Sequence, residues 1–173
     1  MPDGSAKAAL APPRKVFGPE QLVGPDGLLR HGGVWLAPPS SPGQLIVGEG
    51  IETVGSAAVL YGAPARPVAT LGLKALQGLW LSDPFGRVDL SRLQPDPSYP
   101  GFTWPNPEAH PWAGPLICLD MDGNPIKVRV PGEGNAHRVI ELDGAARAAV
   151  CASLAAAAWL ETGVSGCAFA LPP

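Results

Sequence analysis

The clearest hydrophobic pattern lies in the first half of the chain. Residues 44–47 (QLIV) form a short apolar run rich in β-branched side chains, which predicts a buried strand. Apolar side chains then recur at helical spacing over residues 51–61 and stop at Gly62, which predicts a helix. A second apolar run, residues 67–71 (PVATL), predicts the next strand. Strand, glycine turn, helix and strand are the order of a βαβ unit with parallel strands.

A long irregular insertion follows this unit. We expect a short helix at residues 73–81, and residues 82–115 then contain eight prolines without regular periodicity. Insertions of this length inside a compact domain are usually functional or disordered. Aromatic side chains within it predict that it is pinned onto the domain surface, and these are Phe85, Tyr99, Phe102, Trp104 and Trp112.

Regular patterns return after the insertion. Residues 115–119 (PLICL) predict a buried strand, and residues 126–130 and 137–142 predict a hairpin around a glycine-rich turn. An alanine-rich helix is expected at about residues 144–161. The predicted fold class is therefore α/β, with a small, mainly parallel sheet flanked by helices and long Pro/Gly-rich irregular segments.

The chain has 22 glycines and 22 prolines among 173 residues, and their positions indicate the domain organisation. Most prolines lie outside the predicted strands, and 46% of the residues are hydrophobic, which supplies one core. We expect an irregular N-terminal arm at 1–43 with short strands, an α/β domain at 44–162 that contains the insertion at 82–115, and a C-terminal tail at 163–173.

The net charge and the cysteines limit the partners, metal sites and cellular compartment that we expect. A net charge of −3 argues against a protein that holds nucleic acid by bulk positive charge, and leaves room for a local site. Cys118, Cys151 and Cys167 form no CxxC pair, which disfavours zinc binding and a disulfide framework. The apolar stretch 145–160 is too short to span a membrane and contains Arg147. We expect a cytoplasmic protein without membrane contacts and without a secretory signal.

Three acidic residues follow predicted strands. Glu49 comes after the first strand, and Asp120 and Asp122 come after the strand at 115–119. Carboxyl ends of parallel strands meet at one edge of a sheet, where such folds place their functional groups. Carboxylates and water are the ligands that Mg²⁺ prefers, and the ion suits phosphoryl chemistry because it neutralises phosphate charge. The alternative is that these are ordinary acidic turn residues, since Asp and Gly are common in turns.

Two basic residues flank the second predicted strand. Arg66 and Lys74 lie in the expected loops beside it and are candidates for weak contacts to nucleic-acid phosphates. The alternative is that both are solvated surface charges.

The segment LIVGEGIETVGSA resembles the first motif of the Toprim domain, in the GEGIET form found in phage and plasmid primase-helicase proteins. The upstream piece RHGGVWLAP is similar to the glycine-containing strand that precedes this motif in those proteins. The resemblance covers about residues 30–81 and 115–125. It implies that Glu49 is a general acid/base or metal ligand, and that Asp120 and Asp122 form the DxD pair that binds Mg²⁺ or Mn²⁺. At the third acidic position of the family's DxDxDP pattern this chain has Asn124.

The resemblance implies a Mg²⁺-dependent phosphoryl or nucleotidyl transfer protein related to the DNA primases of mobile elements. Its implied partners are DNA or RNA and a helicase or other replication protein. Whether the chain is an enzyme stays open, because a non-catalytic Toprim-like protein that binds DNA or a replication partner is the alternative. A third interpretation is a phosphatase of the haloacid dehalogenase type, since ICLDMDGNP also resembles its nucleophile motif, with Asp120 as nucleophile and Asp122 as acid/base.

Overall fold

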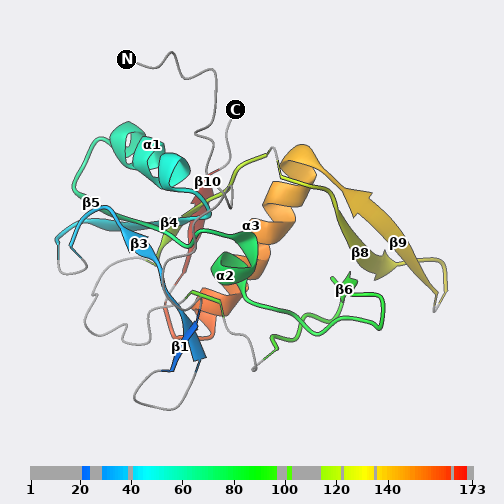
Figure 1. The fold of residues 1–173 in the computed structure, drawn as a ribbon. Coiled ribbons are helices and arrows are strands. Elements are labelled where there is room, and N and C mark those ends of the chain that lie inside the picture. Colours follow the sequence, from blue (N-terminus) through cyan, green and yellow to red (C-terminus); the bar gives the residue numbers. More distant parts are fainter. Residues whose placement is uncertain are drawn as a thin grey trace, which may run out of the picture.

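The chain folds into a mixed α/β structure with three sheets and three helices in the part that is described (Figure 1). The structure is a computed structural model that describes residues 21–23, 29–38, 41–96, 101–102, 114–121, 123–134, 136–164 and 166–170. The strands are β1 (Gln21–Val23), β2 (Leu29–His31), β3 (Val34–Trp35), β4 (Gln44–Gly48), β5 (Ala65–Ala69), β6 (Val88–Asp89), β7 (Leu116–Cys118), β8 (Ile126–Pro131), β9 (His137–Leu142) and β10 (Ala168–Ala170). The helices are α1 (Ile51–Tyr61), α2 (Leu73–Gln77) and α3 (Gly144–Leu160).

The central sheet has five strands in the order β10-β7-β4-β5-β3. Strands β10, β7, β4 and β5 pair in parallel, whereas β3 pairs with β5 in the antiparallel direction. The expected mainly parallel sheet is thus a mixed one, because the connection from β3 to β4 is too short for the helical crossover that parallel strands need. Strands β3 and β10 come from the segments that the sequence assigned to the arm and the tail, so the sheet extends beyond 44–162 on both sides.

Helices cover both faces of the central sheet (Figure 1). On one face, Leu45 and Val47 of β4 belong to the large apolar core that α2 and α3 complete, in which Trp159 is 2% exposed. On the other face, Ile46 packs with Val54 of α1. Successive residues of a strand point to opposite faces, so β4 is apolar throughout because both of its faces are buried.

The helix boundaries follow the glycines. Helix α1 ends at Tyr61 as predicted, and Gly62 adopts a left-handed conformation with φ 67°. Helix α2 ends at Gln77, earlier than the predicted Leu81, because Gly78 at φ 72° takes the chain out of the helix.

Phe102 attaches the insertion to the core. Phe102 is 7% exposed, its ring centroid lies 6.2 Å from that of Trp35 and 6.5 Å from that of Trp159, and its amide donates a hydrogen bond to the Ala75 carbonyl. Phe85 does not pack on the core, since it is 80% exposed with the Arg87 guanidinium 4.6 Å from its ring centroid. The remaining aromatic candidates, Tyr99, Trp104 and Trp112, lie outside the described residues.

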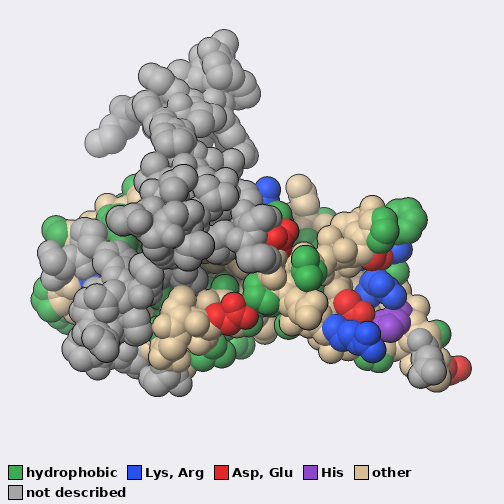
Figure 2. All heavy atoms as spheres, turned by 90° about the horizontal axis from the view of Figure 1, so that it is seen from below, with side chains coloured by type: hydrophobic (Ala, Val, Ile, Leu, Met, Phe, Trp, Pro, Cys, Tyr) green, Lys and Arg blue, Asp and Glu red, His purple; other side chains and the backbone are tan. Residues whose placement is uncertain are grey.

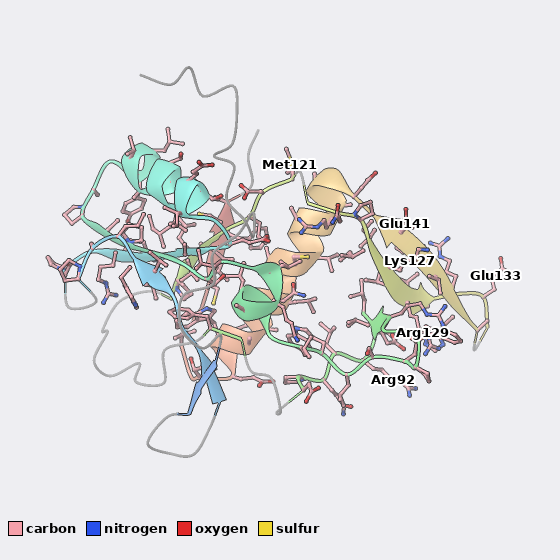
Figure 3. The ribbon with its side chains drawn as sticks, viewed as in Figure 1. Arg92, Met121, Lys127, Arg129, Glu133 and Glu141 are labelled. Atoms are coloured by element: carbon pink, nitrogen blue, oxygen red, sulfur yellow. The ribbon has the colours of Figure 1, made fainter. Side chains whose placement is uncertain are left out.

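The predicted hairpin forms a separate three-stranded sheet. Strands β8 and β9 pair antiparallel, and β6, which the sequence did not predict, adds to β8 in parallel. Figure 1 shows this sheet on the side of α3 away from the central sheet. Its surface carries both signs of charge (Figures 2 and 3), including a pair between Lys127 and Glu141 at 3.6 Å and one between His137 and Asp89 at 3.2 Å.

Within the described part of the chain, no helix combines the length and the apolar character needed to cross a membrane.

Candidate active site at the carboxyl edge of the central sheet

The register of the central sheet brings Glu49 and Asp120 to one edge. Gly48 at the end of β4 is paired with Ala69 of β5 on one side and with Cys118 of β7 on the other. Since the three strands are parallel, the residues that follow them leave the sheet at its carboxyl edge. Glu49 and Asp120 therefore both follow strands that end at this edge, and Asp122, the third acidic candidate, lies outside the described residues.

A hydrogen bond joins the two acidic motifs. Thr53, in the first turn of α1, has its hydroxyl oxygen 2.9 Å from Oδ1 and 2.8 Å from Oδ2 of Asp120. The hydroxyl donates to this carboxylate, which also lies beside the N-terminus of α1, where the helix dipole favours negative charge. The GEGIET segment and the DxD segment, 67 residues apart, thus meet through their side chains.

A buried arginine supports the same loop from the opposite side. Arg147 of α3 is 4% exposed and its Nη1 donates a hydrogen bond of 3.3 Å to the backbone carbonyl of Asp120. Gly123 lies against the guanidinium, since a Cβ at this glycine would come within 2.2 Å of the Arg147 Cζ. The backbone after β7 is consequently held by α3, while the Asp120 side chain is held by α1.

Two buried thiols lie near the charges of this edge. Burial raises the pKa of the Cys151 thiol, the Arg147 charge lowers it, and the Glu49 charge raises it further. Burial and the nearby Asp120 charge raise the pKa of Cys118 to about 11. Both thiols are therefore protonated at neutral pH and contribute to packing rather than to nucleophilic chemistry.

The edge also contains a strained residue. Leu71, directly after Thr70, has φ 62°, which is unfavourable for a bulky side chain, and it is 64% exposed. Its amide donates a 2.9 Å hydrogen bond to the Glu49 carbonyl, which holds the conformation in place. Such strain occurs more often at functional sites than elsewhere.

The two basic candidates differ in their exposure to solvent. Lys74 lies in α2, which follows the carboxyl end of β5, and its side chain is exposed at this edge. Arg66 lies inside β5 and is 1% exposed, because the strand begins at Ala65 rather than at the predicted Pro67. Burial lowers the pKa of the Arg66 guanidinium. The buried side chain is not accessible to a phosphate.

The described residues at this edge include two carboxylates, Glu49 and Asp120, and carboxylates are among the ligands that Mg²⁺ prefers. Among the described residues no group of three or more His, Cys, Asp and Glu side chains is arranged to hold a metal ion. Mg²⁺ keeps several waters and is commonly bound by one or two carboxylates together with substrate phosphates. Glu49 and Asp120 follow neighbouring parallel strands, and the hydrogen bond from Thr53 restrains the Asp120 carboxylate.

Sequence reasoning missed two residues of this site. Thr53 stands in the GEGIET segment, and its place in the first turn of the predicted helix was a signal that it faces the strand ends. Arg147 is the lone charge in an alanine-rich helix, and a single charge in a buried apolar element calls for a polar partner.

Comparison of the chain with known proteins gives no match to a family model, a curated protein or a solved structure.

Proposed function

We propose that the chain is a Toprim-type protein that performs Mg²⁺-dependent phosphoryl or nucleotidyl transfer on nucleic acid, related to the DNA primases of mobile elements. The observation that carries this proposal is the hydrogen bond from Thr53 to Asp120, since it ties the GEGIET segment to the DxD segment. The parallel register of β4 and β7 supports it, because both carboxylates then leave the sheet at one edge.

Three acidic residues and one lysine take part in the proposed reaction. Glu49 takes the proton from the attacking hydroxyl and later returns one to the leaving group. Asp120 and Asp122, with Glu49, would hold Mg²⁺, which would neutralise charge on the transferring phosphate. Lys74, exposed beside the same edge, contacts a phosphate of the nucleic acid. A helicase or another replication protein is the proposed partner.

An assay of nucleotide incorporation on single-stranded DNA with Mg²⁺ tests the proposal, with cleavage of a labelled oligonucleotide as a second readout. Glu49→Gln and Asp120→Asn are expected to lower the rate by about 10²-fold or more, because acid/base and charge-stabilising groups contribute at that level. Glu52→Gln is the matched control, since Glu52 is an exposed carboxylate in the first turn of α1. Equal rates in all variants, or no Mg²⁺-dependent turnover in the wild type, contradict the proposal.

The same variants identify the phosphatase alternative. Hydrolysis of a generic phosphate monoester that is lost in Asp120→Asn and retained in Glu49→Gln would assign Asp120 as a nucleophile.

Arg147 favours one second candidate, a non-catalytic Toprim-like protein that binds DNA. Its buried positive charge lies beside the loop that contains Asp120, where it offsets the acidic charge without a metal. DNA binding measured by fluorescence anisotropy in EDTA, unchanged in Glu49→Gln and Asp120→Asn, would support this candidate over the enzyme.

A further inference from the structure

Thr53 is placed to act on a carboxylate in another part of the fold. Gly50 is the N-cap of α1 and provides no side-chain hydrogen bond to the helix, and Thr53 follows three residues later. The Thr53 hydroxyl is within 2.9 Å of both carboxylate oxygens of Asp120. A hydroxyl has one proton, so it donates to either oxygen and restricts rotation of the carboxylate.

The surroundings leave Asp120 few alternative positions. Its backbone carbonyl accepts a hydrogen bond from the buried Arg147. The missing side chain at Gly50 keeps the space open, since a Cβ there would lie 3.1 Å from the Thr53 hydroxyl oxygen and 3.8 Å from Asp120 Oδ2. Helices α1 and α3 thus both contact Asp120, α1 through the Thr53 hydroxyl on the carboxylate and α3 through Arg147 on the backbone carbonyl.

We infer that Thr53 is a positioning residue that orients the Asp120 carboxylate for Mg²⁺. This inference rests on the proposed function and assigns Thr53 no contact with the substrate. Partners that hydrogen-bond a ligating carboxylate fix its orientation, and their loss usually costs about 10- to 100-fold in metal affinity.

Titration calorimetry with MgCl₂, repeated with MnCl₂, tests this role without requiring turnover. Thr53→Val removes the hydroxyl and keeps the side-chain shape, and we expect Mg²⁺ affinity to fall about 10-fold or more. Thr53→Ser restores the donor and is expected to bind close to the wild-type value. Ser56→Ala is the control, because it removes an exposed hydroxyl from the same helix. Circular dichroism and thermal unfolding establish that each variant is folded, and Thr53→Ala replaces Thr53→Val if the latter does not fold.

The possible results distinguish a failure of the positioning role of Thr53 from a failure of the proposed function. Wild-type binding of Mg²⁺ with equal affinity in Thr53→Val contradicts the positioning role alone and leaves the metal site standing. Equal weakening in Thr53→Val and Thr53→Ser also contradicts it, since the hydroxyl would then be irrelevant. Absence of Mg²⁺ and Mn²⁺ binding in the wild type contradicts both the inference and the proposed function.

Discussion

Gly123 packs against the guanidinium of Arg147, with no room for a Cβ at this glycine. A Cβ at Gly123 would be 2.2 Å from Cζ and Nη2 and 2.4 Å from Nη1. The guanidinium is buried and hydrogen-bonded to the Asp120 carbonyl, so it has little freedom to move aside. This contact ties the loop after β7 to α3 and sets the position from which the Asp120 side chain reaches α1.

We therefore predict that Gly123→Ala lowers the free energy of unfolding by about 1–3 kcal/mol, the usual cost of overpacking a buried contact. The measurement is urea unfolding at neutral pH. Gly32→Ala serves as the control, because a Cβ at Gly32 meets nothing within 4 Å. Gly123→Ala with the stability of Gly32→Ala would show that Arg147 does not hold the loop.

Phe102 attaches the insertion to the core, so its truncation should be costly. Its ring lies between Trp35 and Trp159 and is 7% exposed. We predict that Phe102→Ala reduces the free energy of unfolding by about 3–5 kcal/mol, the range for aromatic truncations in cores. Phe85→Ala removes an 80% exposed ring from the same insertion and should change it by less than about 1 kcal/mol. Similar losses in both variants, measured by urea unfolding, would contradict this assignment.

The buried thiol of Cys118 makes stability depend on pH in the alkaline range. Its pKa is raised from 9.0 to about 11, so the folded state favours the protonated thiol more than the unfolded state does. This contribution is complete below the unfolded pKa and is lost as pH rises through the folded pKa. Relative to Cys118→Ala, the wild type should lose about 2 kcal/mol of unfolding free energy between about pH 8 and 10.5.

Urea unfolding of both proteins under a reducing agent measures this difference. A difference between wild type and Cys118→Ala that stays constant across this pH range would show that the thiol titrates normally in the folded state. Cys151 and Cys167, whose pKa values are also raised by burial, are present in both proteins and cancel in the comparison.

The elements that the sequence predicted well are those with a clear hydrophobic pattern. Strand β4 is a continuous apolar run, helix α1 has apolar residues at helical spacing, and the β8/β9 hairpin has two runs with recurring apolar residues around a glycine-rich turn, and the bounds of all of them agree closely with the prediction. Strands β6 and β10 were not predicted, because they have two and three residues and their positions depend on pairing with distant strands. The mixed direction of the central sheet likewise depends on β3, which pairs in the antiparallel direction with β5, a strand distant from it in the sequence.

The sequence predicted those residues of the candidate site that follow strands, and it did not predict the residues that helix packing brings there. Glu49 and Asp120 directly follow strands, and the parallel register determines that they share an edge. Arg147 could not be placed there from sequence, since the packing of α3 against the sheet decides which helix residue reaches the loop. Arg66 was misplaced because a shift of two residues in the start of β5 moves a charged side chain from a loop into the sheet.

Glu49 and Asp120 are proposed to hold a divalent cation at the carboxyl edge of the central sheet. The most direct measurement is anomalous X-ray diffraction from crystals grown with MnCl₂, since Mn²⁺ takes the same oxygen ligands as Mg²⁺. We predict a peak at about the 2.1 Å ligand distance from carboxylate oxygens of Glu49 and Asp120, absent in crystals of Asp120→Asn. A crystal grown at a saturating concentration of MnCl₂ with no peak at this edge would contradict this metal site. The same peak in Asp120→Asn would also contradict it.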